Sequence, residues 1–366
     1  MHDFIDVYTY RGRVGLYLLL KGLGVGENDY VATQAFTCVA VPEAILATGA
    51  KPCFVDIEKV GYNMCPKDLA LKLHTRVKAV VVQHTFGIPA QFESLQNICQ
   101  TNGIPIIEDC CHTLNSTCNG KRVGSLGIGT FYSYEWGKPV VAGIGGSLST
   151  NCDLLRQKVL ELASNFSSPP KKIEYRLKFQ YLVYRLLYRP RLYWPIRKVY
   201  RTLTGLGLAE GNFNKIQENL KSPEFNWSMC KGIKKRLKKS LVMYNKTSSY
   251  SSKIARLYGS KIITDKVIHP SVPENSKSVF CRYPLRSTYK HLILKEAMRE
   301  NIEVADWYIS PIHPLSFKDS LVLNYRHGSC PNAEIRCEEV ITLPLHSKVT
   351  TREAQRTVDF LNYFSP

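Results

Sequence analysis

A carboxylate and a lysine, 29 residues apart, are the side chains of this chain best placed to do chemistry. Asp109 ends the apolar run IPIIED (104–109), and Lys138 follows a second strand-like run, with Ser133 before it and the turn GIGG (143–146) after it. A lysine amine can form a Schiff base with an aldehyde, and a carboxylate can keep a pyridinium nitrogen protonated. Hydroxyl and backbone N–H groups bind phosphate. Together these groups are what an enzyme needs to hold pyridoxal 5'-phosphate (PLP).

Each of these residues alone has a plainer explanation. An Asp at the end of a strand commonly caps a turn, and a single Lys is commonly a solvated surface charge. The order and spacing of the whole set favour the cofactor site over these alternatives.

The same stretch resembles the DegT/DnrJ/EryC1/StrS family of sugar aminotransferases. Members read roughly IEDxAQ/H and then FSFxxxKxxxxGxGG, and this chain reads IEDCCH (107–112) and FYSYEWGKPVVAGIGG (131–146). Residues 23–58 and 341–364 also resemble family segments, in the right order. The resemblance covers nearly the whole chain apart from about residues 166–222, which are expected to form a basic, aromatic helical insertion.

Between Val14 and Thr150, short β-branched runs alternate with helical segments, which indicates a doubly wound α/β sheet. The resemblance implies fold type I of the PLP-dependent transferases, with a large mixed-sheet domain over 1–245 and a smaller α/β domain over 246–366. The expected strands are 30–33, 51–56, 77–84, 104–109, 129–134, 146–150 and 280–286, and the expected helices include 41–48, 95–102, 248–260 and 352–364.

The resemblance also implies catalytic roles for three residues. Lys138 would be the Schiff-base lysine, Asp109 the partner of the pyridinium nitrogen, and His112 a neighbour of the cofactor's phenolic oxygen. A hydrogen-bonded histidine at a helix start is the alternative for His112. Some family members are dehydratases that carry His in place of the lysine, so Lys138 favours transamination.

The phosphate site follows the family less closely. Ser133 matches the family's phosphate-binding hydroxyl, but the loop that usually reads Ser-Gly-Thr here reads Arg11-Gly12-Arg13. Gly12 keeps the close backbone approach, and Arg13 is expected to replace the lost hydroxyl with a charge-assisted contact.

Other motif positions predict contacts around the cofactor. FNWSM (225–229) resembles the family's YNYRM, whose Asn reaches the neighbouring subunit's phosphate site, so Asn226 is expected to act in trans within a homodimer. The family's aromatic over the cofactor ring is absent, and Phe36 or a residue elsewhere would replace it. His313 and Glu334 are expected on the substrate side.

The formal net charge is +19, which favours anionic partners. Residues 171–201 place Lys and Arg among Tyr, Trp and Leu. They are read either as an insertion packed on the protein or as a hairpin at an anionic membrane surface, broken by Pro190 and Pro195. A third reading, nucleic-acid binding, is not favoured because no binding motif is present, so no nucleic-acid partner is predicted.

Twelve cysteines without regular spacing indicate buried thiols in a reducing compartment, and without a CxxC pattern no metal site is predicted. No secretory signal and no spanning helix are predicted either. We therefore expect a cytoplasmic protein, with peripheral attachment to the inner face of the membrane as the alternative.

The resemblance implies an aminotransferase that moves an amino group from an amino acid, expected to be glutamate, to a keto-sugar. That sugar would be nucleotide-linked and destined for polysaccharide or lipopolysaccharide. Two alternatives remain: a non-catalytic PLP-fold scaffold or regulator at the membrane, and a PLP-dependent sugar dehydratase.

Overall fold

The structure is a computed structural model that describes residues 5–206, 208–209 and 222–366. Its centre is a seven-stranded sheet in the order β1-β10-β9-β6-β5-β2-β4. Strand β10 runs antiparallel to its two neighbours, and the remaining pairs are parallel. The strands are β1 (Val7–Thr9), β2 (Tyr30–Gln34), β4 (Lys51–Val55), β5 (Val77–Gln83), β6 (Ile106–Asp109), β9 (Gly129–Ser133) and β10 (Gly146–Thr150).

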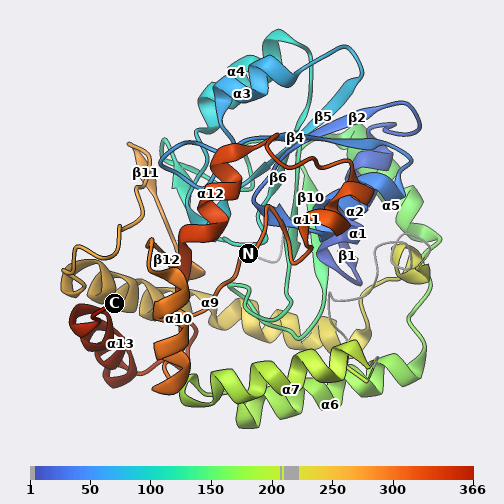
Figure 1. The fold of residues 1–366 in the computed structure, drawn as a ribbon. Coiled ribbons are helices and arrows are strands. Elements are labelled where there is room, and N and C mark those ends of the chain that lie inside the picture. The colour runs from blue at the N-terminus through green and yellow to red at the C-terminus, as the bar shows by residue number, and fades with distance from the viewer. Residues whose placement is uncertain (1–4, 207, 210–221) are drawn as a thin grey trace.

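Alternate residues of the central strands face two different helical layers. Val31, Val81 and Ile107 pack with one set of helices, whereas Ala32 and Val82 face the other set. The first set is α1 (Gly12–Gly22), α2 (Ala40–Ala47) and α5 (Asp153–Ser164), and the second is α3 (Pro66–Lys72) and α4 (Phe92–Thr101). Figure 1 shows α3 and α4 together above the sheet, so the doubly wound arrangement is confirmed.

A second core is built from the C-terminal third of the chain. Strand β12 (Arg282–Arg286) pairs antiparallel with β14 (Val340–Pro344), and their apolar side chains pack on α10 (Lys290–Arg299), α13 (Thr351–Tyr363) and the end of α9 (Lys231–Lys261). The expected domain boundary at 245/246 falls inside α9, a single helix of 31 residues. The division into two domains therefore stays a prediction, and one helix joins both parts.

Short elements complete the described chain. Strand β13 (Ile312–His313) runs parallel to β3 (Thr37–Cys38), and this pairing connects the two cores. The others are β7 (Thr117–Cys118), β8 (Lys121–Arg122), β11 (Ser276–Lys277), α11 (Phe317–Ser320) and α12 (Pro331–Glu339).

The basic aromatic insertion is a helical hairpin beneath α9 (Figure 1). Its described part consists of α6 (Lys171–Leu187), a short 3-10 turn (Pro190–Leu192) and α7 (Tyr193–Gly205), and residues 207 and 210–221 of the expected insertion lie outside the described residues. Pro190 begins the turn, as expected, but Pro195 lies in the first turn of α7, where a missing N–H costs no helical hydrogen bond. The prediction that Pro195 interrupts the segment is therefore wrong. Within the described ranges, no helix is long and apolar enough to cross a membrane.

Candidate active site

The candidate site lies where the parallel strands β5, β6 and β9 end. Asp109 is the last residue of β6, Ser133 is the last residue of β9, and Gly12 opens α1 beside them. A Cβ added to Gly12 would lie only 3.0 Å from the Cβ of Ser133. Because parallel strands end at the same edge of a sheet, the fold brings these three predicted residues together.

Lys138 lies on a glycine-rich turn between β9 and β10. Gly143 and Gly145 have φ angles of 97° and 132°, where a residue with a side chain would be strained. The turn is anchored from α9, because the Arg236 guanidinium donates to the carbonyl oxygen of Ala142 at 2.6 Å. The turn thus gives Lys138 a fixed position.

The amine of Lys138 lies beside an aromatic ring and several acidic groups. Its Nζ is 5.4 Å from the centroid of the Trp307 ring. Burial lowers the pKa of Lys138, but Cys111, Cys38 and Asp109 raise it more, so the pKa lies above its ordinary value. A positive group next to Asp109 would weaken the effect of Asp109 on Lys138. The pKa of Lys138 would then fall, and its amine would lose a proton more easily.

Asp109 is buried and accepts a hydrogen bond from the backbone N–H of Cys111 at 2.9 Å. Burial raises the pKa of this carboxyl, and the Cys111 hydrogen bond and the charge of Lys138 offset only part of the increase. A buried carboxylate of this kind is stabilised by a cationic partner such as a pyridinium N–H.

His112 is buried against aromatic side chains. Its Nδ1 accepts the backbone N–H of Phe86 at 3.1 Å, and its ring centroid is 5.0 Å from that of Trp307. Burial and the nearby charge of Lys138 hold the pKa of His112 well below its ordinary value. The ring is therefore neutral, with its proton on Nε2 as a donor.

Lys138 and His112 line a cavity of about 170 Å³, whereas Asp109 does not line it but is buried close enough to Lys138 for that charge to act on its carboxyl. Four of the predicted residues or their loop neighbours line it: Arg11, His112, Lys138 and His313. The other lining residues were not predicted for the site: Cys38, Glu135, Trp136, Gly143, Ile144, Tyr200, Trp307, Tyr308 and Pro314.

The sequence profile of the DegT/DnrJ/EryC1/StrS aminotransferase family matches residues 7–180 and 237–362. The chain belongs to this family. The unmatched stretch, 181–236, overlaps the insertion that the resemblance had left out. The predicted family, and with it the PLP-dependent fold type I, is confirmed.

Named relatives of the family differ in how much of the chain they match. The pleiotropic regulatory protein of Geobacillus stearothermophilus is 26% identical over 96% of this chain and 83% of its own. GDP-perosamine synthase of Vibrio cholerae is 33% identical, over 41% of each chain. UDP-2-acetamido-2-deoxy-3-oxo-D-glucuronate aminotransferase of Pseudomonas aeruginosa is 35% identical, over 42% of this chain and 43% of its own.

Solved structures of similar fold include DesV from S. venezuelae, with a TM-score of 0.76, 20% identity and coverage of 97% of this chain and 83% of that one. Spr1654 from Streptococcus pneumoniae has the same TM-score, 19% identity and coverage of 97% and 86%, and was solved in PLP and PMP forms. PLP is the cofactor of this family.

The ring end of the site fits PLP. It offers the amine of Lys138 and the neutral His112 N–H at the cavity wall, and the buried carboxylate of Asp109 near that amine. The close packing of Gly12 on Ser133 leaves no room for a larger side chain in the phosphate loop. Gly12, Ser133 and the amides at the start of α1 would hold the phosphate.

The arginines of the phosphate loop contact carboxylates. Arg11 lies 2.9 Å from both Glu135 and Glu224, and Arg13 forms an ion pair with the buried Glu43. Burial raises the pKa of Glu224, but Arg11 and Arg13 lower it more, so it lies below the ordinary value. The expected contact of Arg13 with a phosphate stays a prediction, and it would have to compete with Glu43.

The remaining predicted residues lie in different places. Asn226 is exposed at the end of a 3-10 turn (Pro223–Asn226), as a residue acting on a neighbouring subunit would be. His313 lines the cavity, and burial together with Arg201 and Arg197 lowers its pKa to about 3. Glu334 does not line the cavity, because it accepts hydrogen bonds from the Tyr325 hydroxyl and the Gly328 N–H, each at 2.7 Å.

Phe36, offered as a replacement aromatic, is buried outside this cavity. Its ring stacks on Tyr308 at 4.2 Å between centroids. The aromatic rings that line the cavity include Trp307 and Tyr308, which follow one another in a segment with no motif that marks them. Only their place before His313 could have suggested a role.

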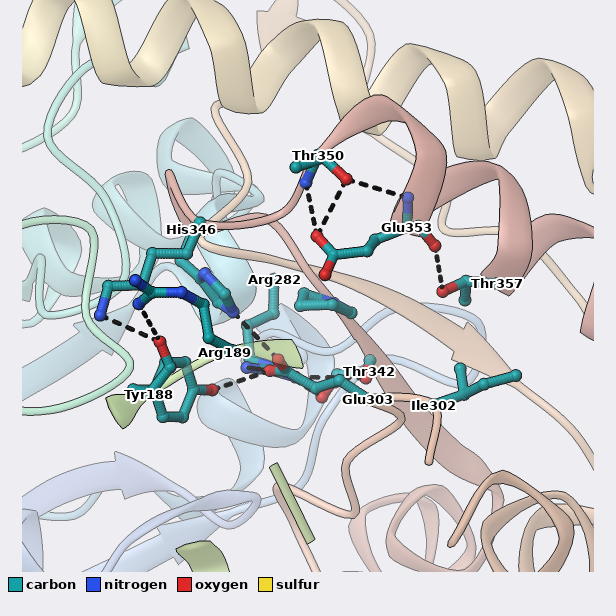
Figure 2. A network of polar contacts seen from close by, with 12 residues as sticks. Tyr188, Arg189, Arg282, Ile302, Glu303, Thr342, His346, Thr350, Glu353 and Thr357 are labelled. Carbon is teal, nitrogen blue, oxygen red and sulfur yellow. Dashed lines mark hydrogen bonds and ion pairs between the residues drawn. The ribbon is translucent and has the colours of Figure 1, made fainter. Parts of the chain in front are cut away.

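The α6–α7 hairpin is fixed to the C-terminal core beside the site. The hydroxyl of Tyr188 donates to Glu303 at 3.0 Å, and Glu303 also binds Arg282 and His346 (Figure 2). Arg197 of α7 forms an ion pair with Asp306, the residue before Trp307. The insertion thus packs beside the cavity, which Tyr200 of α7 lines, and its sequence alone did not indicate this position.

Proposed function

We propose that this protein is a PLP-dependent aminotransferase that moves an amino group from an amino acid, with glutamate as the expected donor, to a keto-sugar. The proposal is carried by Lys138 and His112, which line one cavity, and by the buried carboxylate of Asp109, on which the charge of Lys138 acts. The relatives named as a perosamine synthase and a glucuronate aminotransferase support a sugar acceptor and a place in polysaccharide or lipopolysaccharide synthesis. Their names make a nucleotide-linked keto-sugar the first acceptor to test.

Bound PLP supplies an aldehyde for the amine of Lys138 and an electron sink for the donor's α-carbon. Asp109 would hold the pyridine nitrogen protonated, and His112 would donate its Nε2–H at the cavity wall. The free Lys138 amine would act as the base that takes up and returns a proton. His313 is neutral because its pKa is lowered to about 3, and the Trp307 ring lies 5.4 Å from the Lys138 amine.

Absorbance tests this function. The PLP-loaded protein should show a visible band that borohydride removes, and glutamate should deplete that band while 2-oxoglutarate forms. A band that glutamate leaves unchanged would favour the non-catalytic regulator, the second candidate. The near full-length match to a relative named as a pleiotropic regulatory protein keeps that candidate open.

We further propose a homodimer with shared sites, because Asn226 is exposed in its own chain. Mixing Lys138→Ala and Asn226→Ala chains should restore activity, since half of the sites in a mixed dimer then have both intact residues. Random pairing predicts about a quarter of the wild-type sites. Absence of any restored activity, with mixed dimers verified by mass, would contradict action in trans.

Peripheral contact with an anionic membrane at the cytoplasmic face is also proposed for the hairpin. Residues 171–205 hold ten Lys and Arg residues and one Glu, and Tyr175, Leu182 and Leu186 are exposed on α6. Such a helix suits a bilayer interface. Flotation with vesicles of anionic lipid should recover the protein at low salt and lose it at high salt. Recovery that is equal on neutral vesicles would contradict the proposal.

A further inference from the structure

A second cavity, of about 920 Å³, lies between the α6–α7 hairpin and the body of the protein. Its volume is near the upper end of the range of roughly 300–1,000 Å³ that is common for ligand pockets. It shares five lining residues with the smaller cavity, namely Trp136, Lys138, Tyr200, Trp307 and His313. The two cavities therefore meet at the candidate active site.

The hairpin side of the large cavity carries aliphatic side chains among aromatic and basic ones. Val183 and Leu187 of α6 face it together with Ile196, Val199 and Leu203 of α7. Val183 is 37% exposed and Val199 57%, although both lie on the inner side of the hairpin. Burying such side chains against an apolar ligand is favourable.

The junction of the two cavities is positively charged. Arg197, Arg201 and Lys138 line the cavity there, close enough to His313 to act on its protonation. Arg197 is already paired with Asp306, whereas the side chain of Arg201 lies at the exposed end of α7. A phosphate or diphosphate group at this junction would lie between the amine of Lys138 and the aliphatic wall.

We propose, on the basis of the aminotransferase function above, that the acceptor is a sugar joined through phosphate to a hydrophobic chain. The sugar would reach Lys138, the phosphate would lie near Arg201, and the chain would fill the cavity beneath the hairpin. This substrate class accounts for an insertion that lies mostly outside the family match and yet lines the active site.

Calorimetry with farnesyl diphosphate as the probe tests the proposal on the PLP-loaded, full-length protein. We expect binding at least about tenfold tighter than that of inorganic pyrophosphate or UDP. Val183→Trp, which fills the cavity, should weaken farnesyl diphosphate binding about tenfold. Leu154→Trp on α5 is the control, because Leu154 is 72% exposed and does not line the cavity, and the affinity of this variant for farnesyl diphosphate should stay within about twofold of wild type.

Val199→Trp repeats the test from α7 if Val183→Trp fails to fold. Equal affinity for UDP and farnesyl diphosphate, or unchanged affinity in both filled variants, would overturn the proposal. If Val183→Trp or Val199→Trp binds no farnesyl diphosphate and also becomes monomeric, the proposal would be overturned as well. The cavity would then be part of an interface between two copies of the chain.

The readout separates the two proposals. If farnesyl diphosphate binds but glutamate does not deplete the visible band of the PLP-loaded protein, the assignment of the cavity would stand and the aminotransferase function would be rejected. If the protein transfers an amino group to a soluble nucleotide sugar and shows no preference for farnesyl diphosphate, the aminotransferase function would stand and the lipid-linked acceptor would be rejected.

Discussion

At the ring end of the candidate site Lys138, Asp109 and His112 match the family motif, whereas at the phosphate end Arg11 and Arg13 replace the usual hydroxyl residues. The residues at the ring end would have to form a Schiff base and keep a ring nitrogen protonated, and few side chains other than an amine and a carboxylate can do this. The phosphate end has only to hold an anion, which backbone amides, hydroxyls or cations can all do. The comparison indicates that binding groups were exchanged while reacting groups were kept.

The largest effect is expected at the ring end. Lys138→Ala should abolish the borohydride-sensitive band and lower turnover by at least about 1,000-fold, because no other lysine among the described residues lines this cavity. Lys239→Ala, on the exposed side of α9, is the control and should behave as wild type. A retained band in Lys138→Ala would mean that another lysine holds the cofactor.

Asp109→Asn should lower turnover on the order of 100-fold, because the ring nitrogen loses its anionic partner. The same substitution should increase the stability of the cofactor-free protein. Burial raises the folded-state pKa of Asp109, so its ionised form destabilises the cofactor-free fold above the ordinary Asp pKa of about 4. The cofactor-free variant should therefore be more stable at pH 7, by about 1 kcal/mol in urea titrations. A less stable variant would contradict this electrostatic account.

At the phosphate end, the effect should be on stability. Arg11 and Arg13 hold the pKa of Glu224 below its ordinary value, so its charge stabilises the fold above about pH 4.3, and that contribution is lost as the pH falls. Glu224→Gln should cost about 2 kcal/mol of unfolding free energy at pH 7. The difference from wild type should shrink towards pH 3.5. An exposed-site control, Glu338→Gln, should show no such loss.

The smallest expected effect is on cofactor affinity. Glu135 occupies Arg11 at the wall of the cavity, so Glu135→Gln should free the guanidinium for a phosphate and tighten PLP binding about threefold to fivefold. Fluorescence titration of the cofactor-free protein measures this. Weaker binding in the variant would show that Glu135 supports the site rather than competes for it.

The sequence was sufficient to predict six of the seven strands of the central sheet, but not the short β1, and to predict that Asp109 follows a strand. β-branched runs such as 77–84 are visible locally, and a strand that ends in Asp109 places that carboxylate at the ligand-binding edge. It was not sufficient for the ion pairs of Arg11 and Arg13, because each partner lies on a separate element. The position of the hairpin depends in the same way on contacts such as Arg197 with Asp306, which no local pattern encodes.

Helix α9 contributes to both halves of the protein. Its 31 residues make a rod of about 46 Å at 1.5 Å per residue. Near its start Arg236 anchors the turn that carries Lys138, and near its end Tyr258 is buried in the C-terminal core. A hinge at 245/246 would have to break this rod. A tilt of the C-terminal half would therefore move the whole helix, and with it Arg236 and the turn that carries Lys138.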